Sequence, residues 1–266
     1  MGLMGLYNKA EADMIQEMLQ SKRSIEVLSE IDSTNTYLLS HLKNGHYRRA
    51  VIAHRQTGGK GRLGRSFYSP EGGLYISLDT EIPGDDEKFF RLLTPAAGVA
   101  AARAISVTTG IDVGLKWVND IELGGKKLGG ILAQSTVCPD GVRRAVVGIG
   151  INVNVTSFPD EISSRATSLL LHRPGGTFNI NELAAVIINS FDHYISLIYA
   201  GDVSVIESYR SLLTTIGRTV TVIPANDAPR YTATALDVSD DGSLIVLCDD
   251  GSRRMLDSGE VSIRAK

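Results

Sequence analysis

Residues 50–78 read AVIAHRQTGGKGRLGRSFYSPEGGLYISL, and four glycines and three cations lie within residues 58–65 of this stretch. Glycine lets a backbone approach a ligand closely, and Lys and Arg neutralise an anion. Gly59 to Gly64 also form a literal G-x-G-x-x-G, but a dinucleotide-binding site requires a strand before the glycines and a helix after them. Here a loop and a second strand at 74–78 follow the glycines. We therefore reject a Rossmann fold and interpret residues 58–65 as an anion-binding loop.

The flanking sequence predicts an α+β fold, with a mixed β-sheet flanked by helices. Strands and helices do not alternate regularly, which argues against a doubly wound sheet. Ser33 and its neighbours predict a helix N-cap, and Pro95 predicts a break or restart in its helix. A short connection predicts a hairpin between strands 113–118 and 126–137. The periodicity predicts helices at 9–21, 87–109 and 181–199, and strands at 24–31, 50–53, 74–78, 113–118, 126–137 and 142–155.

The composition changes after Leu213. Short alternating segments rich in β-branched residues follow, separated by Asp-Asp-Gly turns at 240–242 and 249–251. We expect a larger domain at residues 1–214 and a small SH3-like β-barrel at residues 215–266.

Composition excludes several classes of protein. The 266 residues are 43% hydrophobic and 21% charged, with a formal net charge of −3, so no general attraction to nucleic acid or membranes is expected. Cys138 and Cys248 lie far apart without a CxxC, which argues against a zinc site or disulfide scaffold and fits the reducing cytoplasm. The chain begins without a secretory or myristoylation signal, and no apolar run approaches the roughly 18 residues of a membrane span. We expect a cytoplasmic protein.

Glycines interrupt two apolar strands. Gly129 and Gly130 follow Lys127, and Gly148 and Gly150 alternate in the next strand. Such glycines usually mean that a ligand or another backbone comes close. Asn119-Asp120 alone would fit an ordinary turn, and Lys126-Lys127 alone would fit a solvated strand edge. Together with the cationic loop, the segments indicate a slot for a flat, partly apolar molecule that bears an anion.

Taken in order, these segments resemble the motifs of the biotin–protein ligases, which attach biotin to carboxylase carrier proteins. The resemblance runs from about residue 24 to the C-terminus. Lys60 stands where the family usually has arginine, which keeps the charge and loses the bidentate fork. Val118 stands where the family usually has proline, which affects only the stiffness of the turn. The matching segments are Ser33-Thr34-Asn35, Gln56 with residues 59–65, and residues 116–120, 127–132, 148–152 and 259–264.

The resemblance implies a class II synthetase-like catalytic domain and a biotin–[acetyl-CoA-carboxylase] ligase activity. Such an enzyme uses ATP to convert biotin into biotinyl-5'-AMP with release of pyrophosphate, assisted by Mg²⁺. It then transfers biotin to a specific lysine of a carboxylase's biotin carrier domain. A lipoate–protein ligase, or a non-catalytic module that binds biotin or a nucleotide, remains an alternative.

By the same resemblance, Lys127 and Arg62 are the expected catalytic residues, and no metal ligands can be assigned. The implied biotin contacts are Ser33, Thr34, Asn35, Gln56, Gly59, Lys60, Gly61, Arg62, Lys127, Gly130, Gly148 and Gly150. The implied ATP contacts are Lys60, Arg62, Arg65, Trp117, Asn119, Asp120, Lys127 and Asn152.

Some family members carry an N-terminal helix-turn-helix domain and repress transcription. Only about 23 residues precede the first expected strand here, against the roughly sixty that such a domain needs. We therefore expect the protein to act on a carrier domain and to bind neither nucleic acid nor a membrane. The formation of a homodimer remains open.

Overall fold

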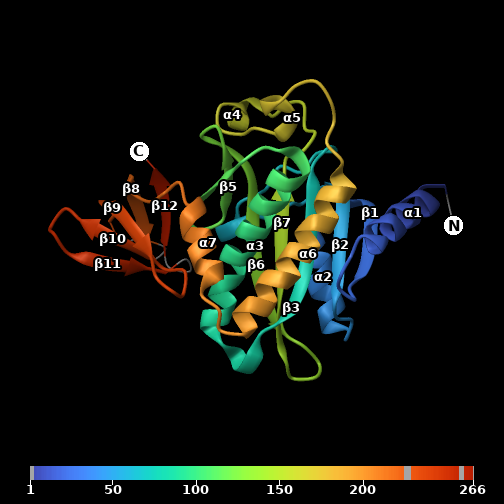
Figure 1. Ribbon diagram of the computed structural model, residues 1–266, viewed down its shortest axis with the longest axis horizontal. Helices are drawn as coiled ribbons and strands as arrows, with labels where there is room; N and C mark the ends of the chain where they lie inside the picture. Colours follow the sequence, from blue (N-terminus) through green and yellow to red (C-terminus); the bar gives the residue numbers. More distant parts are fainter. Residues whose placement is uncertain (1–2, 225–228, 258–260, 266) are drawn as a thin grey trace.

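The structure is a computed structural model that describes residues 3–224, 229–257 and 261–265 (Figure 1). Its larger sheet has the strand order β1-β2-β3-β7-β6-β5-β4. Strands β1 and β2 are parallel, and every other neighbouring pair is antiparallel, so the predicted mixed sheet is confirmed. The strands are β1 (Ser24–Ile31), β2 (Arg49–Gln56), β3 (Leu74–Glu81), β4 (Gly114–Lys116), β5 (Asp120–Leu123), β6 (Lys126–Val137) and β7 (Arg143–Ile151).

Helices cover both faces of this sheet. Ile52 belongs to the larger apolar core with α3 and α6, while Val51, the preceding residue of β2, packs with α2. This alternation is what a strand buried on both faces requires. Figure 1 shows α3 and α6 side by side across one face and α1 at the outer edge, beside β1. The helices are α1 (Leu3–Glu17), α2 (Thr34–Lys43), α3 (Glu87–Thr109), α4 (Asp160–Ser163), α5 (Leu169–His172), α6 (Ile180–Tyr199) and α7 (Ser204–Leu212).

Helix α3 is continuous, so the break expected at Pro95 is wrong. The proline is buried, and Gly242 of the C-terminal sheet lies against it: a Cβ on Gly242 would be 3.5 Å from Pro95 Cγ. Burial and packing against the C-terminal sheet therefore outweigh the local cost of the proline. Within the described residues, α3 has the length and composition of a membrane-spanning helix, but 72% of its apolar window is buried, as in a core helix.

Two other predictions also need correction. The predicted hairpin between strands 113–118 and 126–137 is wrong, because β5 lies between β4 and β6 and pairs with both. The sequence did not predict β5, because this strand has only four residues and turn residues lie at both of its ends. Within it only Ile121 and Leu123 are buried. The first helix spans Leu3–Glu17 rather than residues 9–21.

A second, five-stranded antiparallel sheet has the order β11-β10-β9-β8-β12. The small C-terminal β-unit is thus confirmed, while the boundary between residues 214 and 215 stays a prediction. Of the motif at 259–264, residues 259 and 260 lie outside the described residues. The strands are β8 (Thr219–Pro224), β9 (Tyr231–Val238), β10 (Leu244–Cys248), β11 (Arg253–Leu256) and β12 (Val261–Ala265).

An ion pair fastens α1 to the sheet. His54 Nε2 on β2 lies 2.8 Å from Glu11 Oε2. The hydrogen bond from Glu11 raises the pKa of His54 above its usual 6.5, although burial opposes this change. A group whose pKa is raised by folding contributes its full stabilisation at pH values below its unfolded-state pKa. This stabilisation is lost as the pH rises through the folded-state pKa.

We therefore expect Glu11→Gln to lower the melting temperature at pH 6 and to have much less effect at pH 9, where the imidazole is neutral in either protein. Thermal unfolding at the two pH values measures the difference. Glu17→Gln, at an exposed position of the same helix, is the matched control. An equal loss at both pH values would show that the ion pair does not hold α1.

Candidate active site

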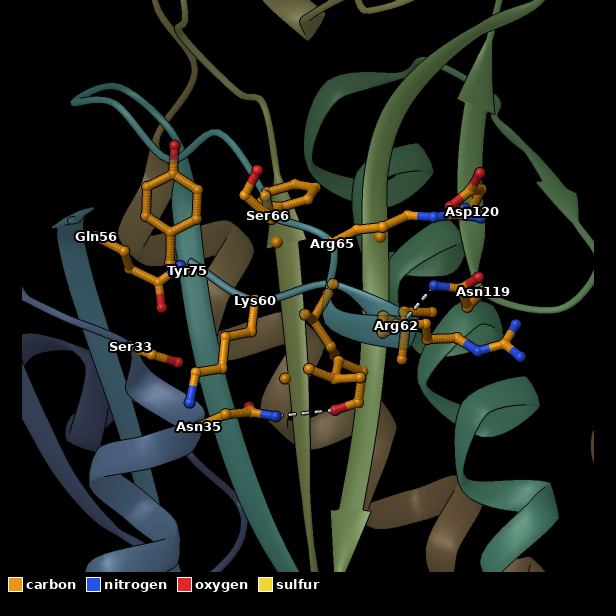
Figure 2. Close-up of a pocket in the computed structure, with 18 of the residues that line it drawn as sticks. Ser33, Asn35, Gln56, Lys60, Arg62, Arg65, Ser66, Tyr75, Asn119 and Asp120 are labelled. Carbon is orange, nitrogen blue, oxygen red and sulfur yellow. Dashed lines mark hydrogen bonds between the residues drawn. The ribbon is translucent and has the colours of Figure 1, made fainter. Parts of the chain in front are cut away.

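A pocket opens where β1, β2 and β3 meet the cationic loop, and it extends over β7 and β6 to β4 and β5 (Figure 2). It collects segments that are far apart in the sequence. The predicted site residues that line it are Ser33, Thr34, Asn35, Gln56, Lys60, Gly61, Arg62, Arg65, Trp117, Asn119, Asp120, Lys127, Gly130, Gly148 and Gly150.

Two predicted site residues, Gly59 and Asn152, are not among those that line the pocket. A Cβ on Gly59 would lie 2.4 Å from Phe67 O, so only glycine allows the loop to fold back on itself there. Asn152 is buried, and its Nδ2 donates to Thr167 O at 3.0 Å. Gly59 thus lies against the backbone of the lining residue Phe67, whereas Asn152 lies outside the lining.

Hydroxyl and amide groups form the end of the pocket beside α2. Ser33 caps α2 by accepting from Thr36 N, which confirms the predicted N-cap. The backbone N and the hydroxyl of Thr34 donate to Gln56 Oε1 at 2.9 and 3.1 Å. Gln56 Nε2 in turn donates to Ser69 Oγ at 3.0 Å. This end therefore presents short donors and acceptors that their neighbours hold in place.

The floor of the pocket is formed by the glycines of β7. A Cβ on Gly148 would lie 2.2 Å from Asn35 Oδ1, and one on Gly150 would lie 2.6 Å from Phe67 Cε1. The cleared face expected from the sequence is present, but the amide of Asn35 and the ring of Phe67 occupy it. Asn35 is fixed there, because its Nδ2 donates to Leu132 O at 3.1 Å and its Oδ1 lies 2.7 Å from Ser77 Oγ.

Several residues of the pocket were missed from the sequence. Phe67 could have been noticed as an aromatic residue directly after the cationic loop. Tyr75 carried no signal in the sequence beyond its place in the strand expected at 74–78. Burial raises the pKa of Tyr75, and its hydroxyl donates to Pro70 O at 2.7 Å. The missed lining residues are Leu63, Ser66, Phe67, Tyr75, Ile76, Lys116, Ile131, Leu132 and Ile149.

The loop cations point in different directions. Figure 2 shows Lys60 directed toward Ser33 and Asn35, and Arg65 directed toward Asp120. In the same view Arg62 extends past Asn119. Burial lowers the pKa of Arg62, and the charge of Asp120 acts in the opposite direction. The loop can thus bring positive charge to both ends of the pocket.

Lys127 lies at the start of β6, inside the pocket. Its Nζ is 2.5 Å from Asp120 Oδ1 and 5.9 Å from the centroid of the Phe67 ring. The backbone of Lys127 is held separately, since its N–H donates to Arg165 O at 2.8 Å. Lys126, the preceding residue, is exposed and does not line the pocket. Lys127 is therefore the one of the pair placed to meet a ligand.

Two family models match the chain: the Biotin/lipoate A/B protein ligase family over residues 27–154 and the Biotin protein ligase C terminal domain over residues 215–264. The structure is similar to that of the biotin protein ligase from Aquifex aeolicus in complex with biotin and ATP. The TM-score is 0.79 at 30% sequence identity, over 92% of this chain and 100% of that chain. The chain belongs to the biotin protein ligase family.

Curated relatives agree with this membership. A biotin--[acetyl-CoA-carboxylase] ligase of Mycobacterium tuberculosis is 29% identical over 241 residues, which cover 88% of this chain and 86% of the relative. The bifunctional ligase/repressor BirA of Bacillus subtilis is 40% identical over 149 residues, 54% of this chain and 44% of the relative. Matches to the bifunctional ligase/repressors span between 37% and 55% of their length. The resemblance inferred from the sequence motifs is confirmed at the level of the family.

At the family's usual proline position, the peptide bond between Trp117 and Val118 is cis. Val118 itself is buried, and its carbonyl accepts a hydrogen bond from the Tyr209 hydroxyl at 3.1 Å. The core beside α7 thus accommodates a valine at position 118, where the family usually has proline.

Gly148→Ala tests whether the glycine floor is required by packing. The new methyl group would meet the anchored amide of Asn35, and such overpacking costs about 1–3 kcal/mol. We expect a lower urea midpoint of unfolding. Gly176→Ala, where nothing lies within 4 Å of a Cβ, is the control and should unfold close to the unmodified protein. Equal midpoints for the two variants would show that Asn35 can move freely.

Proposed function

We propose that the protein is an ATP-dependent biotin–protein ligase. It joins biotin to AMP with release of pyrophosphate and then transfers biotin to a lysine of a carboxylase's biotin carrier domain. The observation that carries the proposal is the convergence of Lys127, the cationic loop and the Ser33–Asn35 polar end in one pocket. The biotin- and ATP-bound Aquifex relative, similar over the full length of its chain, supports it.

Biotin combines a ureido head, an apolar ring system and a carboxylate tail. The polar end of the pocket suits the ureido head, because Ser33, Thr34 and Gln56 supply short donors and acceptors there. Phe67 and Ile149 supply apolar surface next to that end. The tail would then point toward Lys127 and Asp120.

Activation joins two anions. A carboxylate oxygen of biotin attacks the α-phosphorus of ATP, and the bond from that phosphorus to the departing pyrophosphate breaks. Repulsion between two unit charges at ~4 Å is about 4 kcal/mol at an effective dielectric near 20. Lys127, Arg62 and Lys60 offset this repulsion and the charge that develops during transfer.

The other end of the pocket suits the nucleotide. Arg65, Trp117, Asn119 and Asp120 line it, while Asn152, also expected to contact ATP, lies outside the lining. Asn119 is fixed, since its Nδ2 donates to Ile131 O at 2.9 Å. Such positioned groups orient the triphosphate for in-line attack.

Mg²⁺ fits this pocket as an ion carried on the ATP phosphates. Across the described ranges, no three His, Cys, Asp or Glu side chains gather as a metal site. Asp120 is a carboxylate at the nucleotide end, and Mg²⁺ commonly binds through one or two carboxylates plus substrate phosphates. When bound, the ion would neutralise charge on the departing pyrophosphate.

The intermediate has to be protected from water, because biotinyl-5'-AMP is a mixed anhydride. Residues 58–65 can close over it, since they form a loop rich in glycine with Leu63 exposed at its tip. The amine of the carrier lysine then attacks the biotinyl carbonyl carbon, AMP leaves, and an amide bond remains. We place this reaction in the cytoplasm, which the two free, buried cysteines support.

The first expected outcome concerns substrate choice. Purified protein should release pyrophosphate from ATP only when biotin is supplied, and it should label a biotin carrier domain on lysine. A pyrophosphate assay with biotin, lipoate or octanoate measures this. Equal turnover with lipoate would favour a lipoate–protein ligase. Binding of biotin without any turnover would favour a non-catalytic module.

The second outcome concerns Lys127. Lys127→Ala should slow adenylate formation by about 10²–10³, equivalent to about 3–4 kcal/mol of transition-state stabilisation. The melting temperature should hardly change, because Lys127 is 40% exposed and ion pairs of this kind contribute about 0–1 kcal/mol.

Lys126→Ala is the matched control, since Lys126 is exposed on the neighbouring position of the same strand. It should retain full activity. If Lys126→Ala were the damaging change and Lys127→Ala were silent, the catalytic assignment of Lys127 would be wrong.

A further inference from the structure

Two side chains beneath the polar end of the pocket contact its lining residues without lining it themselves. Ser77 on β3 is completely buried, and its Oγ lies 2.7 Å from Asn35 Oδ1 and 2.8 Å from Thr34 Oγ1. Gln134 on β6 is half-buried, and its Oε1 accepts from Asn35 Nδ2 at 3.0 Å. Thr34 and Asn35 line the pocket, whereas Ser77 and Gln134 do not. Ser77 and Gln134 thus form a layer of polar contacts under two lining residues.

A count of the available hydrogens fixes the direction of these hydrogen bonds. One end of the Asn35 amide faces Leu132 O at 3.1 Å, and a backbone carbonyl can only accept, so this end is the nitrogen. The other end, which faces Ser77, is therefore the amide oxygen, and it can only accept as well. The single hydrogen of the Ser77 hydroxyl is thus committed to Asn35 Oδ1.

Thr34 is consequently limited to one role toward a ligand. Its Oγ1 lies 2.8 Å from Ser77 Oγ, whose hydrogen is already committed, and 3.1 Å from Gln56 Oε1. The Oε1 atom of Gln56 is an acceptor, because it also receives the backbone N–H of Thr34 at 2.9 Å. Both neighbours can only accept from Thr34, so its hydroxyl hydrogen points into the protein. Toward the pocket, the hydroxyl offers lone pairs alone.

We propose that Ser77 and Gln134 are positioning residues that make this end of the pocket specific for a ligand with an N–H donor. They hold Thr34 as an acceptor and fix Asn35 beside it. A ureido group carries two such donors. The dithiolane ring of lipoate carries none and would leave the Thr34 lone pairs without a partner, which is costly in a buried site. The identity of the ligand as biotin rests on the proposed function.

Ser77→Ala tests this arrangement, because it removes the donor to Asn35 and an acceptor from Thr34 without enlarging any side chain. We expect roughly tenfold weaker binding of biotin by calorimetry. Desthiobiotin keeps the ureido group and should weaken by the same factor. The affinity for ATP, and any affinity for lipoate, should stay unchanged, because neither ligand uses the Thr34 lone pairs. Without ligand, amide hydrogen exchange over residues 33–36 should become faster, since this segment loses an anchor.

Thr109→Val is the matched control for the loss of a buried hydroxyl. Thr109 is 6% exposed at the end of α3, where its Oγ1 donates to Ile105 O at 2.6 Å and accepts from Ile111 N at 3.2 Å. It does not line the pocket. This variant should therefore unfold at a lower temperature while it binds biotin as the unmodified protein does.

Gln134 supplies a second pair of variants in case Ser77→Ala folds poorly. Gln134→Leu removes the oxygen that accepts from Asn35 Nδ2, whereas Gln134→Glu keeps an oxygen at the same place. The leucine variant should bind biotin more weakly, and the glutamate variant should bind it almost as well as the unmodified protein.

The inference would be overturned by unchanged biotin affinity in both Ser77→Ala and Gln134→Leu, by an equal loss of affinity for biotin and ATP, or by equal effects of the two Gln134 variants. If the unmodified protein bound ATP but no biotin, the proposed function would fail. Faster hydrogen exchange over residues 33–36 in Ser77→Ala would then still show that Ser77 positions this segment, and unchanged exchange would overturn that role too.

Discussion

The close pairing of β6 with β7 at their glycines is the constraint on which the site depends. Gly130 lies directly opposite Gly150, and a Cβ on Gly129 would lie 2.4 Å from Gly150 O. A Cβ at Gly129 would meet the β7 backbone, and the missing side chains at Gly148 and Gly150 leave room on the face toward the pocket. Asn35 and Phe67 enter the space that results. The glycines therefore set where α2 and the cationic loop can rest on the sheet.

The pairing of β6 with β7 also separates the neutral polar groups of the pocket from the charged ones. The hydroxyl and amide groups of Ser33, Thr34 and Gln56 lie at the end of the parallel strands, while Asp120 and Lys127 lie across the glycine floor on the antiparallel side. Lys60 of the loop at 58–65 points toward Ser33 and Asn35, whereas Arg65 of the same loop points toward Asp120. Apart from Lys60, the Ser33 end is neutral and the Lys127 end is charged, which suits a ligand with a neutral head and an anionic tail.

Local patterns predicted much of this architecture, because each relied on interactions between near neighbours. The bounds of β1 and β6, the N-cap at Ser33 and the small C-terminal β-unit follow from alternation and turn residues. β5 was not predicted, because the turn residues at its two ends lie only four residues apart and together look like a single connection. The continuity of α3 through Pro95 and the placement of Phe67 against Gly150 are set by tertiary contacts that no short window contains.

Motif residues also differ in how they serve the site. Lys127 and Asp120 present charge to the pocket. Gly59 instead allows the close approach of the Phe67 backbone, and Asn152 bonds Thr167 outside the lining. Trp117 does both, because its ring lines the pocket while its two N–H groups are consumed by Thr215 and Gly242. A motif shared with a family thus identifies the residues that a site requires, and the hydrogen bonds decide which of them can reach a ligand. Because the donors of Trp117 are already satisfied, we expect any contact of its ring with a ligand to be apolar.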